Sequence, residues 1–177
     1  MRIISGSLKG RAIKPPKNLR ARPTTDFAKE NLFNVLQNLI DFEECDVLDL
    51  FAGTGSISYE FASRGVKSVT SVEINAVHHN FIRQTARELG IRTLFAVKAN
   101  AFLYLKSCTK QFDLIFSDAP YDLEGSEEII PLVLDGNLLR EEGIFIFEHS
   151  KDKNFEDHPL FWQSRSYGSV QFTFFRK

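Results

Sequence analysis

The chain has 177 residues with 43% apolar side chains, which is typical of one globular domain with a sizeable core. Seventeen phenylalanines predict that this side chain fills much of the core. No apolar run approaches the roughly 20 residues of a membrane-spanning helix, the first residues lack a signal-peptide stretch, and the two cysteines show neither disulfide nor metal spacing. We therefore expect a cytoplasmic protein that is not membrane-bound and holds no metal.

The net charge of −1 hides an uneven distribution. Residues 1–22 carry seven basic side chains and no acidic one, whereas residues 23–177 carry 15 basic and 23 acidic side chains, a net charge of −8. A basic segment on an acidic body favours contact with phosphates, although a solvated chain end with chance charge would also explain it. We therefore separate a basic arm, residues 1–22, from a main domain, residues 23–177. The candidate phosphate-binding residues are Arg2, Lys9, Arg11, Lys14, Arg20 and Arg22.

The first predicted element is a hairpin over residues 3–13, with glycines near its turn. A helix follows, in which apolar residues recur at Phe27, Leu32, Leu36 and Leu39 and for which Thr24 or Thr25 is the expected N-cap. Strands and helices then alternate. The apolar patterns predict strands at 45–50, 67–73, 93–98, 111–117 and 143–148, helices at 56–64, 76–89, 101–107 and 127–139, and a final antiparallel pair at 162–167 and 169–175. This order predicts an α/β fold with a mostly parallel, seven-stranded sheet, a C-terminal antiparallel hairpin and a small N-terminal β-hairpin extension.

A glycine loop separates the first strand from the helix that follows it, as in sites where a helix N-terminus meets a nucleotide. The loop lacks the third glycine of the dinucleotide fingerprint, which disfavours NAD. Asp49 at the strand end would repel a pyrophosphate, whereas the sulfonium and ammonium groups of S-adenosylmethionine suit a carboxylate. The candidate cofactor contacts here are Asp49, Phe51, Ala52, Gly53, Thr54 and Gly55.

Polar side chains also end the later strands. Glu73 lies 18 residues beyond Gly55, close to the offset of about 20 at which an acidic residue accepts ribose hydroxyls. Ile74 follows Glu73, and the next strand ends near Asn100 and Ala101, where Asn100 could face an adenine edge. Asp118, at the end of the fourth strand, completes the candidate cofactor contacts. Each polar residue alone would be explained by a helix cap or a solvated turn. Because parallel strands end at one edge of a sheet, the joint pattern instead favours a single ligand site.

The most informative stretch is the turn Asp118-Ala119-Pro120-Tyr121, which follows a buried strand. A carboxylate and a backbone carbonyl can accept the two hydrogens of an exocyclic base amine and turn its lone pair toward an electrophile. An aromatic ring can hold a flipped base by stacking. Asp118, Ala119 and Tyr121 are therefore the candidate catalytic residues for methyl transfer to a base amine.

These motifs together resemble the RsmD family of bacterial methyltransferases over nearly the whole length. The matching pieces are Met1-Arg2-Ile3-Ile4-Ser5-Gly6, Arg22-Pro23-Thr24-Thr25-Asp26, Lys29-Glu30, Leu32-Phe33-Asn34, residues 48–55, Ser71-Val72-Glu73, the turn at 118–121 and the strand containing Glu148. The family's turn is Asp-Pro-Pro-Tyr or Asp-Pro-Pro-Phe, so Ala119 departs from it. Ala119 keeps the acceptor carbonyl and loses only ring rigidity, for which we expect at most about a fivefold effect on rate.

The resemblance implies a Rossmann-like class I methyltransferase that moves a methyl group from S-adenosylmethionine to guanine N2 of 16S ribosomal RNA, leaving S-adenosylhomocysteine. It implies that Asp118 and the Ala119 carbonyl grip the amine, that Tyr121 stacks on the base, and that Glu73 holds the ribose. We expect a monomer that acts on an assembled or assembling small subunit. Three alternatives stay open at this point: an amino-methyltransferase for another base or a protein amide, a non-catalytic RNA-binding assembly factor, and, third, an NAD oxidoreductase.

Overall fold

The computed structural model describes residues 1–16, 19 and 25–177; Arg20, Arg22 and Thr24 lie outside the described residues. Its helices are α1 (Asp26–Leu36), α2 (Ser56–Ser63), α3 (Ala76–Glu88), α4 (Ala101–Ser107) and α5 (Ile129–Leu134), with short 3-10 turns at Phe42–Glu44 and Ser126–Glu128. Its strands are β1 (Asp46–Leu50), β2 (Ser68–Glu73), β3 (Leu94–Lys98), β4 (Phe112–Ser117), β5 (Leu139–Ser150), β6 (Phe161–Tyr167) and β7 (Val170–Arg176).

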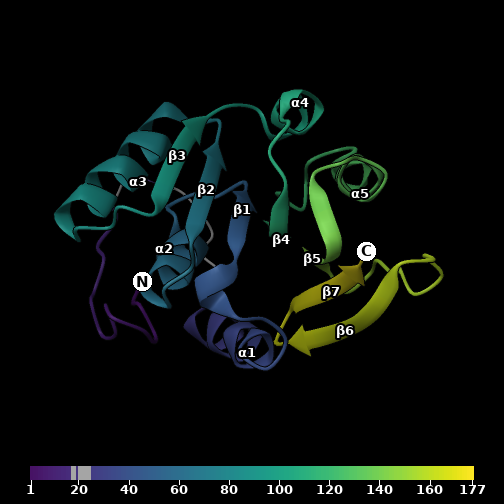
Figure 1. Ribbon diagram of the computed structural model, residues 1–177, viewed down its shortest axis with the longest axis horizontal. Helices are drawn as coiled ribbons and strands as arrows, with labels where there is room; N and C mark the ends of the chain where they lie inside the picture. Colours follow the sequence, from purple (N-terminus) through teal and green to yellow (C-terminus); the bar gives the residue numbers. More distant parts are fainter. Residues whose placement is uncertain (17–18, 20–24) are drawn as a thin grey trace.

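The seven strands form one sheet in the order β3-β2-β1-β4-β5-β7-β6. The pairs from β3 to β5 are parallel, and β7 is antiparallel to both β5 and β6. The chain builds outward from β1 to β3, then crosses back to place β4 on the other side of β1 (Figure 1). The predicted fold class is confirmed, and the point where the strand order reverses lies between β1 and β4, where open α/β sheets bind ligands.

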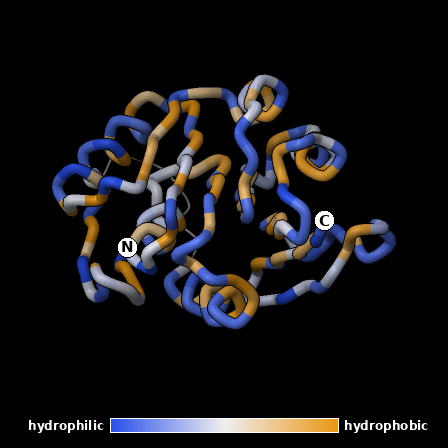
Figure 2. Tube along the Cα trace, viewed as in Figure 1, coloured by the Kyte–Doolittle hydropathy of each residue, from blue (hydrophilic) through white to orange (hydrophobic). Residues whose placement is uncertain are grey.

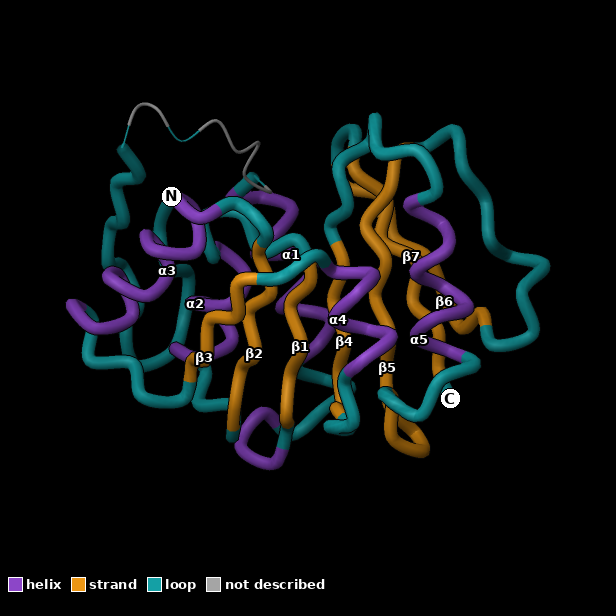
Figure 3. The backbone as a smooth tube through the Cα atoms, turned by 90° about the horizontal axis from the view of Figure 1, so that it is seen from above, coloured by secondary structure: helices purple, strands orange, loops and turns teal. Residues whose placement is uncertain are grey.

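Two apolar clusters cover the two faces of this sheet. Successive strand residues alternate between them, because side chains in a strand point to opposite faces: Val47 belongs to the first cluster and Leu48 to the second. Helices α1, α2 and α3 pack into the first cluster, and α4 and α5 into the second (Figures 1 and 3). In Figure 2 the helices carry both hydrophobic and hydrophilic stretches within each turn, as expected when one face meets a sheet. The predicted phenylalanine core is confirmed by nine fully buried rings: Phe33, Phe61, Phe112, Phe116, Phe145, Phe147, Phe172, Phe174 and Phe175.

Two predicted elements near the C-terminus have different bounds in the structure. The helix predicted at 127–139 is confined to Ile129–Leu134, and the strand predicted at 143–148 begins already at Leu139. The strand continues through an irregular segment between Leu139 and Ile144. Phe112 of β4 pairs with Leu139, but Leu114 pairs with Ile144, so β5 has extra residues between these two pairs. Within this segment Glu142 has a left-handed φ of 62°. Residues 140–143 therefore interrupt the regular pairing with β4 without ending the strand.

Helix α1 begins as predicted and packs differently at its first turn. The Thr25 hydroxyl accepts a hydrogen bond from the Ala28 backbone N–H at 3.1 Å, which makes Thr25 the N-cap. Leu32 and Leu36 are buried, but Phe27 is 63% exposed. Its ring meets the Tyr167 ring in an edge-to-face contact, with 6.3 Å between the ring centroids. The prediction that Phe27 joins the apolar face of this helix is therefore wrong.

The N-terminal hairpin is held by few ladder bonds and many contacts to the domain. A single antiparallel bridge joins Arg2 and Ala12, and the Ile3 N–H donates to the Arg11 carbonyl at 3.0 Å. The side chains of Ile3 and Ile13 are buried in the same core cluster as α1, α2 and α3. The hairpin is therefore part of the folded core as well as a carrier of charge.

Candidate functional site

The site is built at the carboxyl ends of β1 and β4, which are neighbours in the sheet. Leu50, the last residue of β1, pairs with Val72 of β2 on one side and with Ser117 of β4 on the other. This register brings the residues after all three strands to one edge. The same edge therefore holds Asp49, Glu73 and Asp118, the three acids that the sequence predicts to lie there.

The glycine loop after β1 turns the chain sharply into α2. Phe51, Gly53 and Gly55 all have left-handed φ angles, of 57°, 54° and 82°. A Cβ on Gly55 would lie 2.9 Å from the Tyr59 ring, so both the φ angle and the packing require glycine there. A non-glycine residue in this region costs about 1–3 kcal/mol, and strain of this kind at Phe51 is typical of ligand sites.

Asp49 lies beneath this loop and is almost fully buried. Its Oδ2 accepts a hydrogen bond from the Ser58 hydroxyl at 2.5 Å, and that hydroxyl also contacts the hydroxyl of Ser71 at 2.5 Å. Burial raises the pKa of Asp49 to about 7, and the negative charges of Asp118 and Glu73 act in the same direction. A cation placed nearby would favour the ionised carboxylate, so the electrostatics suit a positively charged ligand.

Glu73 connects β2 to the glycine loop. Its Oε2 accepts a hydrogen bond from the Gly53 backbone N–H at 2.8 Å, and its Oε1 accepts one from the Asn75 N–H at 2.7 Å. His78 lies on the same side, with its Nδ1 4.0 Å from Oε1. Each carboxylate oxygen has a second lone pair, so Glu73 can still accept hydroxyl groups of a ribose. Sequence reasoning missed that this side chain also shapes the loop.

The residues predicted to meet an adenine are placed by α3 and α4. Ile74, directly after Glu73, is 60% exposed at the end of β2. The Asn100 side chain caps α4 by accepting a hydrogen bond from the Leu103 N–H at 3.1 Å. Ala101 is buried, whereas Leu103 is 65% exposed. Exposed apolar side chains that follow Glu73 and Asn100 suit a flat ring, and Leu103 was not predicted.

The turn after β4 presents its residues unequally to solvent. Asp118 is half-buried and its backbone N–H lies 3.5 Å from the Leu50 carbonyl, which ties this turn to the glycine loop. Ala119 is buried among the second apolar cluster, and Tyr121 is 38% exposed. The buried hydroxyl of Ser117, the last residue of β4, has no hydrogen-bond partner among the described residues.

Glu148 completes this part of the site and was recognised in the sequence only as part of a strand. It lies near the end of β5, one position beyond Phe147, which pairs with Ser117. Only 4% of Glu148 is exposed, and the Tyr121 hydroxyl donates a hydrogen bond to its Oε1 at 3.5 Å. The signal that could have revealed it is the one used for Glu73: an acid directly after an apolar strand.

The basic hairpin docks on α2, the helix that the glycine loop begins. The buried Glu60 carboxylate accepts the N–H groups of Ile4 and Ser5 at 2.7 and 3.0 Å. The buried ammonium of Lys29 donates to the Arg2 carbonyl at 2.7 Å and to the Ser56 hydroxyl at 3.1 Å. The predicted phosphate-binding residues Arg2, Lys9, Arg11 and Lys14 are exposed, while Arg20 and Arg22 lie outside the described residues.

The hairpin also reaches the glycine loop itself. The Thr54 hydroxyl lies 3.5 Å from the Met1 sulfur, within hydrogen-bonding range for that atom. Together with the bond from Lys29 to Ser56, this contact places the basic hairpin beside the candidate cofactor loop. No helix in the described ranges is long and apolar enough to cross a membrane.

Comparison with known proteins connects this geometry to a family. The model of the family described as Conserved hypothetical protein 95 matches residues 1–176. Ribosomal RNA small subunit methyltransferase D of Haemophilus influenzae is 34% identical over 157 residues, covering 86% of this chain and 80% of that protein.

Solved structures agree with the fold. The candidate methyltransferase yhhF from Escherichia coli superposes with a TM-score of 0.86 at 26% identity, covering 100% of this chain and 97% of that one. A candidate methyltransferase solved with SAH superposes with a TM-score of 0.67 at 16% identity, over 84% of this chain and 49% of that one. The latter likeness concerns the fold alone.

Proposed function

The chain belongs to the family described as Conserved hypothetical protein 95, the RsmD family, and we propose that it methylates the exocyclic N2 amine of a guanine in 16S ribosomal RNA with S-adenosylmethionine. The observation that carries the proposal is the placement of the turn from Asp118 to Tyr121 beside the glycine loop of β1. A methyl donor at one strand end and a base amine at the next would then meet at the switch point of the sheet.

The residues present fit S-adenosylmethionine. Gly53 and Gly55 hold the loop in the left-handed conformations that turn it toward α2, and the buried Asp49 favours a cationic group above it. Glu73 keeps lone pairs for the ribose hydroxyls, and Ile74 and Asn100 lie where an adenine would follow. When bound, this cofactor supplies a methyl group that is already activated on a sulfonium, so the protein mainly aligns the acceptor.

Alignment of the acceptor amine is the role of the Asp118 turn. The Asp118 carboxylate and the Ala119 carbonyl accept the two N–H bonds of guanine N2, which directs its lone pair at the methyl carbon. The nitrogen forms a bond to that carbon as the carbon–sulfur bond breaks, and the electron pair stays on sulfur. The methylated amine then gives a proton to water or to Asp118. Tyr121 stacks on the base, oriented by its hydroxyl bond to Glu148.

Mass spectrometry of nucleosides from 16S ribosomal RNA tests this proposal. Cells that lack the gene should lose one N2-methylguanine, and a plasmid copy of the gene should restore it. Loss of a methylated adenine, or unchanged nucleosides with lost methylation of a protein amide, would point to another acceptor. Unchanged methylation altogether would favour a non-catalytic assembly factor.

A further inference from the structure

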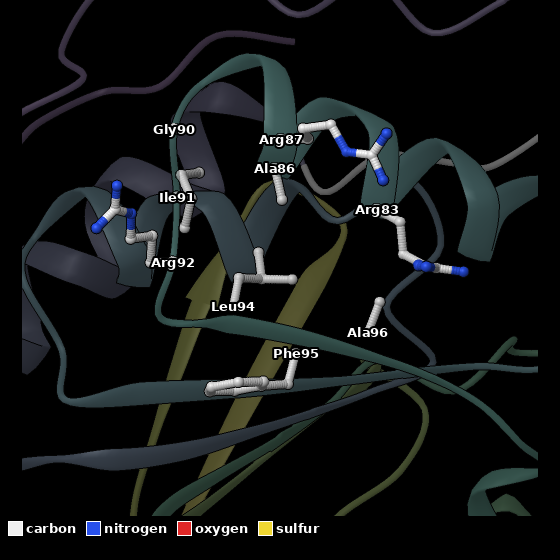
Figure 4. Close-up of a pocket in the computed structure, with 9 residues that line it drawn as sticks. All are labelled: Arg83, Ala86, Arg87, Gly90, Ile91, Arg92, Leu94, Phe95 and Ala96. Carbon is white, nitrogen blue, oxygen red and sulfur yellow. The ribbon is translucent and has the colours of Figure 1, made fainter.

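An arginine-lined groove lies at the β3 edge of the sheet, away from the glycine loop and the Asp118 turn. Arg83 and Arg87 on α3 stand on one side, and Arg92, on the connection to β3, stands on the other (Figure 4). Ala86, Ile91 and Leu94 form the floor between them in a groove of about 610 Å³. The groove is also lined by Gly90, Phe95 and Ala96.

The residues Arg83, Arg87 and Arg92 are exposed, and no described acidic side chain pairs with them. None of them takes part in an ion pair among the residues that the structure describes. The one acid nearby in the helix, Glu88, accepts a hydrogen bond from the Gln84 amide at 2.8 Å instead. Residues 83–98 therefore carry a net charge of +3 on a main domain whose net charge is −8.

Helix stability does not explain this arrangement. Arg83 and Arg87 are four residues apart on one helix face, where like charges repel. The helix dipole accounts for Arg87 in the last turn but not for Arg83 or Arg92.

The chain reverses direction at the end of α3, which places Arg92 across the groove from Arg87. Gly90 has a φ of +69°, the Gly90 N–H donates to the Arg87 carbonyl at 3.1 Å, and the Ile91 N–H donates to the Ala86 carbonyl at 2.8 Å. These two bonds form a Schellman motif, which reverses the chain direction at a helix end. The groove is thus a fixed feature of the backbone, so its three cations are held on opposite sides of one floor.

This groove continues the basic surface of the N-terminal hairpin. Ile13 of the hairpin and Ala86 beneath the groove belong to one core cluster. Figures 1 and 3 both place the N-terminal segment beside the C-terminal end of α3. The two segments that carry the exposed cations Lys9, Arg11, Lys14, Arg83, Arg87 and Arg92 therefore lie next to each other in the fold.

We propose that this groove is a second RNA-docking surface, in which Arg83, Arg87 and Arg92 bind backbone phosphates of the substrate RNA outside the methylated base. The inference rests on the proposed function for the identity of the RNA. Arginine forms planar, bidentate bonds to phosphates, and three unpaired arginines around a groove match a polyanion rather than a single small anion. The groove adds affinity and orientation and takes no part in methyl transfer.

The test is filter binding of unmethylated 16S ribosomal RNA, transcribed in vitro, between 0.05 and 0.2 M salt. The triple variant Arg83→Gln, Arg87→Gln, Arg92→Gln should show a log–log salt slope that is shallower by about 2, at about 0.7 per lost contact. The ratio of the wild-type binding constant to that of the variant should therefore be about 16-fold larger at 0.05 M than at 0.2 M salt. Replacement of the same three residues by lysine should keep the wild-type slope.

A matched control removes three other exposed cations outside ion pairs among the described residues, with Lys67→Gln, Lys106→Gln and Arg165→Gln. This control has the same net charge as the groove variant and should keep a steeper slope than it. Equal slopes in the two triple variants, or a wild-type slope in the groove variant, would overturn the proposal. Because binding is measured without catalysis, a groove that binds RNA in a protein that methylates no guanine would refute only the proposed function.

Discussion

Asp49 and Asp118 lie at the ends of adjacent strands and differ in their exposure to solvent, so we expect different roles for the two carboxyl groups. Asp49 is buried beneath the glycine loop, and its raised pKa of about 7 makes its charge depend on what lies nearby. Asp118 is half-buried in the turn that would grip the acceptor amine. We therefore propose that Asp49 responds to the cofactor and Asp118 to the base.

The raised pKa of Asp49 predicts a pH-dependent affinity for the cofactor. A bound cation favours the ionised carboxylate, so calorimetry should show S-adenosylmethionine binding about tenfold more tightly at pH 8 than at pH 6. Asp49→Asn should bind more weakly and remove this dependence. The sign for folding is opposite: the ligand-free folded state holds a proton that the unfolded chain loses near pH 4, so stability falls as the pH rises toward 7. A pH-independent wild-type affinity would separate Asp49 from the cofactor.

Asp118 is predicted to control turnover and not cofactor binding. Asp118→Ala should reduce turnover by about two to three orders of magnitude, the range for losing one well-placed polar group, with a far smaller change in cofactor affinity. Tyr121→Ala should lose stacking worth about 1–3 kcal/mol. Tyr121→Phe should be mild, because it keeps the stacking ring and loses the long hydroxyl bond to Glu148. Single-turnover kinetics measures both, and near-wild-type turnover in Asp118→Ala would contradict the assignment.

The elements of the sheet could be predicted from sequence because each strand is a short apolar run ended by a polar residue. The strands and helices from β1 to β4 match their predicted places closely. The bulge in β5 was not predictable, because it depends on pairing with β4 and on contacts of Glu142 and Gly143 with Lys177 at the chain end. Local patterns do not contain such long-range pairings.

For the candidate site, the sequence predicts the residues at the strand ends but not the contacts that they make. Acids at strand ends were visible, so Asp49, Glu73 and Asp118 were found. The bond from Glu73 to the glycine loop and the pairing of Tyr121 with Glu148 depend on three-dimensional proximity, so no spacing in the sequence indicates them. The docking of the hairpin on Glu60 and Lys29 was hidden for the same reason.

The N-terminal hairpin is predicted to bind RNA through its exposed charges and to support the fold through its buried residues. Reversal of Lys9, Arg11 and Lys14 to Glu should leave a folded protein whose RNA affinity and salt slope both fall, by electrophoretic shift across a salt series. Ile3→Ala should instead lower the free energy of unfolding by about 2–5 kcal/mol. Removal of residues 1–20 would mix the two effects, because the buried Glu60 would lose the N–H groups of Ile4 and Ser5. Unchanged RNA affinity in the folded charge-reversal variant would leave the hairpin with a structural role alone.

The whole molecule combines an acidic domain with basic segments on one side. The hairpin and the α3 groove carry their cations beside the sheet's β3 edge, and the candidate cofactor loop lies between α2 and the Asp118 turn. A negatively charged domain is repelled by RNA except where such segments face it, so charge placement would orient the molecule on its substrate. The monomeric state and the preference for an assembled small subunit stay predictions.

Quantitative mass spectrometry of 16S ribosomal RNA can test the methylation directly in gene-deleted cells complemented with the wild type or with Asp118→Ala at equal protein levels. The wild type should restore one N2-methylguanine, and Asp118→Ala should leave the same guanine largely unmodified. Full restoration by Asp118→Ala, or a deletion that leaves every N2-methylguanine in place, would contradict the proposed function.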